Sequence, residues 1–145
     1  MTKATNAFGE LGERIAARWL ERQGYTVLAR RWRSGRRDID LIAARDGVVA
    51  FVEVKTRAGT EFGDPVEAVH AQKQRSLVRS AREWMARFDD ASAPAVRASG
   101  SAVRSETTNH SPMRESAQTF RFDVIGVLLK DGTAWVRHVE SAFVM

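Results

Sequence analysis

The sequence has no cysteine, only three histidines and no long apolar run. Disulfides and thiolate metal ligands are therefore excluded. The histidines, His70, His110 and His138, are far apart in the chain, so a histidine-rich zinc cluster is not expected. No window approaches the ~18 apolar residues of a membrane helix, and the polar N-terminal segment lacks the apolar core of a signal peptide. We therefore expect a cytoplasmic protein with no membrane segment.

The chain has 145 residues, enough for a single domain over residues 1–145 with a hydrophobic core. Its net charge of +5 is unevenly distributed. Residues 1–88 hold 17 basic and 11 acidic side chains, whereas residues 89–145 hold 6 and 7. A basic N-terminal part favours polyanionic partners, chiefly nucleic acid, although many basic proteins bind nothing specific.

Hydrophobic periodicity and turn signals predict an α/β protein in the order α-β-β-β-α-loop-β-β. The predicted helices cover residues 9–23 and 64–88, and the predicted strands cover 25–29, 38–44, 48–56, 120–130 and 133–139. Asp64 followed by Pro65 and Glu67 is typical of a helix N-terminus. Residues 89–118 are rich in Ala, Ser, Thr and Arg without periodicity, and we expect a disordered insert there.

A hairpin with Asp46-Gly47 at its turn carries the most informative pattern. If these two residues are the centre of a tight turn, Asp40 faces Glu53 and Asp38 faces Lys55. Directly opposed side chains share one face of the sheet, with Cβ atoms ~4.5–5.5 Å apart. Glu53 and Lys55 also share that face because they are two residues apart in a strand. A different turn length would shift this pairing.

Two carboxylates this close repel each other unless a proton or a cation lies between them. Their oxygen atoms suit Mg²⁺ or Mn²⁺, and a nearby lysine can stabilise charge developing on a phosphate. Asp40, Glu53 and Lys55 are thus a candidate site for phosphodiester hydrolysis. The alternative is a set of cross-strand salt bridges on a solvent-facing sheet. Apolar residues on both sides of Glu53 argue against that alternative, since they indicate a strand covered on both faces.

Other charged residues leave two interpretations open. Glu13 lies at the margin of the apolar arc of its helix, and pairing with Arg14 or Arg18 is the simpler interpretation. Lys73 lies within the apolar stripe of the second helix and either extends into water or reaches across the sheet toward the phosphate site. Asp123 in its apolar strand is expected to pair with an arginine.

Basic residues around the hairpin are candidates for nucleic-acid binding. We expect a basic loop over residues 30–37, with Trp32 in its middle, suited to phosphate contact and base stacking. A merely solvated loop is the alternative. The predicted nucleic-acid-binding residues are Arg31, Arg33, Arg36, Arg57 and Lys73.

Several segments together resemble one known family. They are Gly9-Glu10-Leu11-Gly12-Glu13, Gly24-Tyr25, Ile39-Asp40-Leu41-Ile42-Ala43, Phe51-Val52-Glu53-Val54-Lys55-Thr56-Arg57, Asp64-Pro65, Ala68-Val69, Lys73 and Arg121-Phe122-Asp123-Val124. The chain resembles the YraN family, an uncharacterised bacterial family whose fold is similar to Holliday-junction resolvases and other PD-(D/E)XK, restriction-endonuclease-like nucleases. The resemblance covers nearly the whole chain outside residues 89–118.

This resemblance implies a restriction-endonuclease-like core, a mixed β-sheet flanked by helices. It implies Mg²⁺ or Mn²⁺ held by Asp40, Glu53 and the Val54 carbonyl, with Lys55 as the catalytic lysine and Glu13 as the acid completing the site. Holliday-junction resolvases act as dimers, so it also implies a homodimer. Arg37-Asp38 stands where the family usually has Gly-Glu, and the 89–118 insert is longer than expected.

These observations predict a metal-dependent endonuclease acting on DNA, including branched DNA, in repair or recombination. Two alternatives remain open at this point. One is a nucleic-acid-binding protein that keeps the nuclease fold without catalysis. The other is a protein-interaction subunit whose acids form only structural ion pairs.

Overall fold

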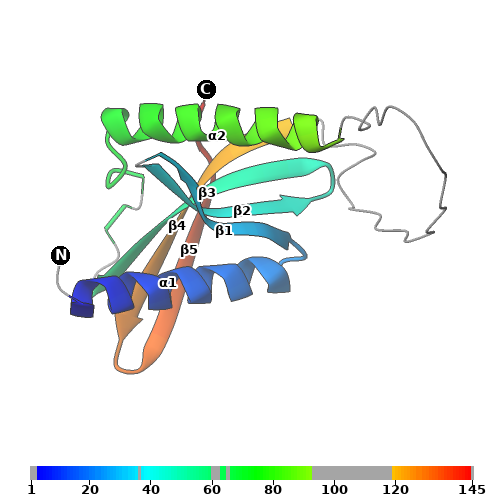
Figure 1. Ribbon diagram of the computed structural model, residues 1–145. Coiled ribbons are helices and arrows are strands. Elements are labelled where there is room, and N and C mark those ends of the chain that lie inside the picture. The colour runs from blue at the N-terminus through cyan, green and yellow to red at the C-terminus, as the bar shows by residue number, and fades with distance from the viewer. Residues whose placement is uncertain (1–2, 36, 60–62, 65, 93–118, 145) are drawn as a thin grey trace, which may run out of the picture.

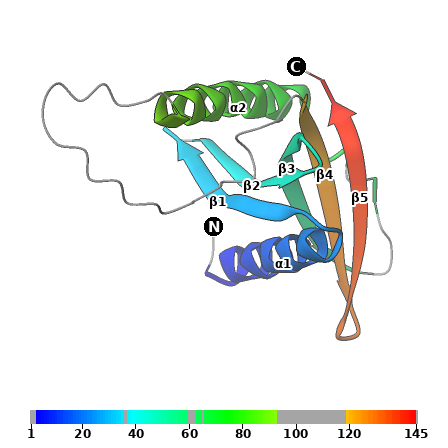
Figure 2. The ribbon, with the colours of Figure 1, turned by 90° about the vertical axis from the view of Figure 1, so that its right-hand side faces the viewer.

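Two helices cover opposite faces of a five-stranded sheet (Figure 1). This computed structural model describes residues 3–35, 37–59, 63–64, 66–92 and 119–144. The elements are α1 (Lys3–Arg22), β1 (Thr26–Ser34), β2 (Arg37–Arg45), β3 (Val48–Ala58), α2 (Ala71–Ser92), β4 (Thr119–Lys130) and β5 (Thr133–Phe143). Figure 2 shows the sheet between the two helices, with α1 lying close to β1. The element order and the flanked sheet confirm the predicted fold class.

The strands follow one another across the sheet in chain order, β1-β2-β3-β4-β5. Neighbouring strands are antiparallel except β3 and β4, which run parallel along their whole length, from Val48–Thr119 to Ala58–Leu129. A parallel pair needs a crossover, and α2 lies in that connection. The sheet is therefore mixed, with β3 near its centre and covered on both faces as predicted.

The hairpin between β2 and β3 has the predicted register. Asp46 and Gly47 both have positive φ, 48° and 76°, as a two-residue turn with the twist of a hairpin requires. Arg45 pairs with Val48, and the pairing continues to Leu41 and Val52. The backbone pairs stop there, although both strands continue, so Asp40 and Glu53 lie just beyond the last pair. Neither expected opposition, Asp40 with Glu53 or Asp38 with Lys55, is among the backbone pairs formed. On its other side Asp38 pairs with Arg33 of β1.

Each face of the sheet forms its own apolar core. Ala50, Val52 and Val54 of β3 pack with Ala16 and Leu20 of α1. Val49 and Phe51, whose side chains point the other way, pack with Leu77 and Trp84 of α2. Glu53 continues the alternation of Val49 and Phe51, so its side chain belongs to the α2 face of the sheet.

Several element boundaries differ from the sequence prediction, including three in β1 and α2. First, β1 extends to Ser34, so most of the expected basic loop is strand. The reason is Trp32, which pairs with Ile39 and packs into the α2-side core. Its ring also makes a cation–π contact with Arg87, with 5.4 Å between the guanidinium carbon and the ring centroid. Trp32 therefore serves packing and is not an open platform for base stacking.

Second, α2 begins at Ala71 and not at Asp64. The carboxylate of Asp64 accepts a hydrogen bond from the backbone nitrogen of Val66, and Val69 closes a single turn onto Val66. Asp64 thus caps a local turn and not the helix. Val69 follows this turn and is buried, and α2 begins two residues later at Ala71. Third, α2 continues to Ser92, so residues 89–92 are helical; the remainder of the expected insert, 93–118, lies outside the described residues.

The first helix is longer than predicted, beginning at Lys3, and the second hairpin turns at Asp131-Gly132 as expected. Neither helix, over the described residues, is long and apolar enough to cross a membrane.

Candidate functional site

A cavity of about 630 Å³ opens where β2 and β3 separate. It is lined by Glu13, Asp40, Glu53, Val54 and Lys55, together with Arg31 and Arg33. The structure therefore brings all the predicted catalytic and metal-binding residues to one cavity, with two of the predicted nucleic-acid-binding residues. Arg57 is exposed beyond it on β3, and Arg36 lies outside the described residues.

Asp40 is fixed at the point of separation by β3. Its Oδ2 atom accepts a hydrogen bond of 2.8 Å from the backbone nitrogen of Val54. Burial and the negative charge of Glu53 together raise the pKa of Asp40 to about 8, against the lowering effect of the Val54 hydrogen bond. The two carboxylates thus repel one another across the cavity, as the hairpin register predicted.

Glu53 is buried, with 4% of its surface exposed. Its Oε1 atom lies 3.3 Å from Lys55 Nζ and 3.8 Å from Lys73 Nζ. Its Oε2 atom is buried and has no hydrogen-bond partner among the described residues. A buried carboxylate oxygen without a donor is costly, so this atom is suited to a cation or a water molecule.

Lys73 reaches the site from α2, which decides between the two interpretations that its sequence position left open. The sequence placed it in an apolar stripe, and the structure directs its amine toward Glu53 on the α2 face of the sheet. Lys55 and Lys73 therefore approach the same carboxylate oxygen from a strand and a helix.

Glu13 lines the cavity from α1 but is held by an arginine of β1. Arg31 Nε donates a 2.7 Å hydrogen bond to Glu13 Oε2, and Arg31 Nη1 donates one of 3.0 Å to Glu10 Oε1. The hydrogen bond to Glu13 is the main reason that the pKa of Arg31 is raised. The partner of Glu13 is thus Arg31, not the expected neighbours Arg14 or Arg18.

Arg31 has a left-handed backbone, with φ of 47°, which is uncommon for a residue other than glycine. It lies between the pairs Arg30–Leu41 and Trp32–Ile39, across from Asp40. Sequence analysis missed both this conformation and the role of Glu10, because the three partners are 18 and 21 residues apart and share no local spacing.

The approach of α1 to this region depends on Gly12. A Cβ atom at Gly12 would overlap the whole side chain of Thr56, including its Cβ. Glycine therefore lets α1 lie against β3 one residue before Glu13, which helps to bring that carboxylate to the edge of the cavity.

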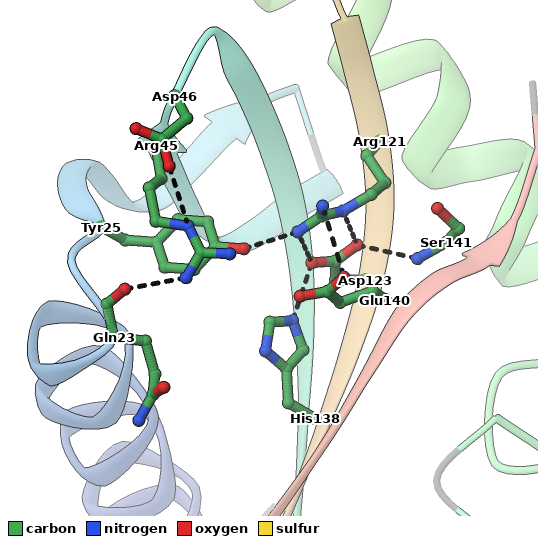
Figure 3. A network of polar contacts seen from close by, with 9 residues as sticks. All are labelled: Gln23, Tyr25, Arg45, Asp46, Arg121, Asp123, His138, Glu140 and Ser141. Atoms are coloured by element: carbon green, nitrogen blue, oxygen red, sulfur yellow. Dashed lines mark hydrogen bonds and ion pairs between the residues drawn. The ribbon is translucent and has the colours of Figure 1, made fainter.

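A second buried polar network lies between β4 and β5 (Figure 3). Asp123 is fully buried and receives two hydrogen bonds from Arg121, of 2.7 and 2.8 Å. It also contacts His138 Nε2 at 2.7 Å and accepts a hydrogen bond from the Ser141 backbone nitrogen. Burial alone would raise the pKa of Asp123, but these partners outweigh it and the pKa is lowered. Pairing with an arginine is as predicted.

This network also connects β4 to Tyr25, the residue before β1, and β5 to α1. Arg121 donates a hydrogen bond of 2.7 Å to the Tyr25 hydroxyl, and His138 packs edge-on against Trp19 of α1, with 5.0 Å between the ring centroids. Both carboxylate oxygens of Asp123 thus have partners within the chain, from Arg121, His138 and Ser141. The arrangement is that of a structural network, and none of its residues lines the site cavity.

The described residues contain no group of three or more histidine, aspartate or glutamate side chains arranged to hold a metal ion. Five carboxylates line the cavity. Glu10 and Glu13 are engaged by Arg31, and Asp38 is engaged by Arg33. Asp40 and Glu53, with the backbone carbonyl of Val54, remain as candidate donors to a cation. Oxygen donors of this kind fit Mg²⁺ or Mn²⁺, which complete their coordination with water.

A mixed five-stranded sheet between two helices, with two acids and a lysine where β2 and β3 part, defines an α/β protein of the class expected from the sequence. Residues 12–127 match the model of uncharacterised protein family UPF0102. The chain belongs to this family, which is the YraN family.

Relatives from three bacterial genera match this chain, two of them over more than 90% of both chains. A UPF0102 protein of Trichlorobacter lovleyi is 36% identical over 143 residues, 97% of this chain and 93% of the relative. One of Bifidobacterium longum is 34% identical over 94% of this chain and 92% of the relative. A shorter match, to a UPF0102 protein of Chloroherpeton thalassium, is 47% identical over 54% of this chain and 61% of the relative.

Proposed function

We propose that this protein is a metal-dependent endonuclease that hydrolyses phosphodiester bonds of DNA at the cavity between β2 and β3. One observation carries the proposal. Two carboxylates and a lysine meet at a cavity, and the buried Oε2 atom of Glu53 has no donor among the described residues. A salt-bridge cluster that served stability alone would satisfy such an oxygen.

The donor set fits Mg²⁺ or Mn²⁺ held by Asp40, Glu53 and the Val54 carbonyl. Such an ion, when bound, supplies a Lewis acid for the phosphate and lowers the pKa of a coordinated water. The Val54 backbone nitrogen fixes the orientation of Asp40. Lys55, with its amine beside Glu53, is positioned to stabilise negative charge that develops on the phosphate.

DNA is the proposed substrate because arginines stand beside the acid cluster, although those at the cavity are paired with acids, Arg31 with Glu10 and Glu13 and Arg33 with Asp38. Arg31 and Arg33 lie at the cavity and Arg57 lies exposed beyond it, so phosphates on either side of the cleaved bond meet cations. Branched DNA and a homodimer are the form of substrate and the assembly that the resemblance to Holliday-junction resolvases favours.

A non-catalytic nucleic-acid-binding protein is the second candidate, and one observation favours it. The acids at the cavity are already matched by cations of the chain itself, Glu53 by Lys55 and Lys73 and Glu13 by Arg31. A site balanced in this way has less need of a metal ion. Cleavage therefore has to be measured, not inferred from binding.

The test is cleavage of four-way-junction and linear DNA by the purified protein with Mg²⁺, Mn²⁺ or EDTA. Asp40→Ala and Lys55→Ala are the site variants. Asp46→Asn is the matched control, since Asp46 is an exposed acid at the other end of the same hairpin. Metal-dependent cleavage that both site variants lose and the control keeps supports the proposal. Salt-sensitive binding without cleavage in any metal contradicts it and supports the second candidate.

A further inference from the structure

The site cavity continues into two smaller cavities along α1. The first, of about 290 Å³, shares Glu10, Glu13 and Arg31 with the site cavity. The second, of about 380 Å³, shares Arg14 and Arg30 with the first. Because each cavity shares lining residues with the next, the three lie in a row between α1 and β1, leading away from Asp40 and Glu53. This row of cavities is the α1–β1 groove. Figure 2 shows the two elements side by side along this line.

The open charge of this groove is positive. The three glutamates that line the two outer cavities are all paired with arginines of β1, Glu10 and Glu13 with Arg31 and Glu21 with Arg30 at 3.6 Å. Arg14 and Arg18 make no ion pair with any described residue. They are exposed, and four residues apart on α1 they stand on one face, about 6 Å from each other along the helix axis. Successive phosphates of one strand suit such a spacing.

Apolar side chains line the same groove. Leu11, which is 39% exposed, and the half-buried Ile15 lie on the same face of α1 as the two free arginines. A surface that offers cations beside apolar side chains matches the phosphates and the sugar and base faces of a nucleic-acid strand.

We infer that the α1–β1 groove binds a single-stranded segment of the DNA, which Arg14 and Arg18 hold by its phosphates as it leaves the site cavity. This inference rests on the proposed function and narrows its substrate to DNA with a single-stranded arm next to the cleaved bond.

Binding to two fluorescent DNAs tests the groove. One is a blunt duplex, and the other is the same duplex with a single-stranded arm of about eight nucleotides. Fluorescence anisotropy in EDTA gives affinity against salt for the wild type, for the double variant Arg14→Gln/Arg18→Gln, and for Arg75→Gln/Arg79→Gln. The last is the matched control, because Arg75 and Arg79 are also exposed and four residues apart, but on α2 across the sheet.

The arm should strengthen binding to the wild type and steepen its salt dependence. Arg14→Gln/Arg18→Gln should remove about 1.4 from the slope of log K against log salt with the armed DNA, since each single-strand phosphate contact contributes about 0.7. Binding of the blunt duplex should not change, and the control should keep the full effect of the arm. An arm without effect, or equal losses in the two double variants, overturns the inference.

Cleavage of the same two DNAs separates this inference from the proposed function. If cleavage requires Asp40 and Lys55 but neither the arm nor Arg14 and Arg18 matters, the groove assignment fails and the nuclease stands. If the arm is bound through Arg14 and Arg18 but no metal supports cleavage, the groove stands and the nuclease fails.

Discussion

The Oδ2 atom of Asp40 lies 2.8 Å from the backbone nitrogen of Val54, so a side chain of β2 bonds to β3 just beyond the last backbone pair of the hairpin. This contact holds the acid at the cavity although burial and the charge of Glu53 both oppose its ionised form. Asp40 is thus held where its ionised form is unfavourable, which lowers the stability of the fold. Functional positions often carry such a cost in stability.

Asp40→Asn should therefore stabilise the protein in the absence of divalent metal. The amide oxygen can still accept the Val54 hydrogen bond. The amide carries neither the charge that Glu53 repels nor the proton that a pKa of about 8 makes the folded protein take up at pH 7. We expect a gain of about 1–2 kcal/mol in the free energy of unfolding, measured by denaturant titration in EDTA. Addition of Mg²⁺ should stabilise the wild type and not the variant. A variant that is less stable than the wild type in EDTA would contradict the unfavourable interaction between Asp40 and Glu53.

The two lysines beside Glu53 should differ in their effect on cleavage. Lys55→Gln should reduce metal-dependent cleavage about 100-fold or more, as removal of a group that stabilises developing charge does. Lys73→Gln should reduce it about tenfold, because the Lys73 amine is farther from Glu53, at 3.8 Å against 3.3 Å, and more exposed.

Arg75→Gln is the control for Lys73, since it removes an exposed charge from the same helix. The measurement is the single-turnover cleavage rate at saturating protein. If Lys73→Gln and Arg75→Gln have the same rate, the approach of Lys73 to Glu53 has no part in the reaction.

The hairpin could be predicted from the sequence because its information is local. Asp46-Gly47 specifies a two-residue turn, the turn specifies the register, and the register brings Asp40 close to Glu53. Alternation within β3 gave the burial of Glu53 in the same way. The fold class followed from the order of such local signals.

Contacts between distant segments could not be predicted. Nothing near Arg31 indicates that its guanidinium binds Glu13 of α1, 18 residues earlier. The extension of β1 depends on the packing of Trp32 into the core on the α2 face of the sheet. This packing outweighs the loop signal of the surrounding arginines. The predicted start of α2 was wrong because a local signal was read too far. Asp64 does accept a capping hydrogen bond from Val66, but it caps a single turn and not the helix.

Acid should weaken the fold through Asp123. Its pKa is lowered in the folded state, so the stability it contributes is present above the unfolded pKa of about 3.9 and is lost as the pH falls through the lower folded value. The unfolding free energy should therefore decline below about pH 4. Asp123→Asn should cost about 3–5 kcal/mol at pH 7, because Arg121 loses its buried carboxylate partner and keeps only the half-exposed Glu140 at 3.7 Å, and should flatten the decline at low pH.

Glu140→Gln is the matched control for Asp123. Glu140 also approaches Arg121, at 3.7 Å, but its side chain is half exposed. Its loss should change the stability by about 0–1 kcal/mol at pH 7 and leave the acid dependence as in the wild type. Equal effects of the two substitutions would show that burial of Asp123 does not make it the main acid-sensitive group of the network.

Two glycines of α1 should respond in opposite ways to the same substitution. Gly9→Ala places a Cβ atom in open space and should stabilise the protein by about 0.5–1 kcal/mol, the usual preference for alanine within a helix. Gly12→Ala brings the same helical gain, but its Cβ atom would overlap Thr56 of β3. The helix or the strand must then move, so we expect a net loss of about 1–3 kcal/mol.

Because Gly12 precedes Glu13, the displacement caused by Gly12→Ala should also reach the site. Cleavage should fall in Gly12→Ala even under conditions where the protein remains folded. It should fall less in Gly9→Ala, which adds one methyl group in open space at the lining of the same cavity and displaces nothing. The double variant Gly12→Ala/Thr56→Ala removes the outer atoms of the overlapping side chain and should recover part of the lost stability. Denaturant unfolding of the wild type, Gly12→Ala, Thr56→Ala and the double variant measures this coupling. If Gly12→Ala is as stable and active as Gly9→Ala, the close contact between α1 and β3 does not position Glu13.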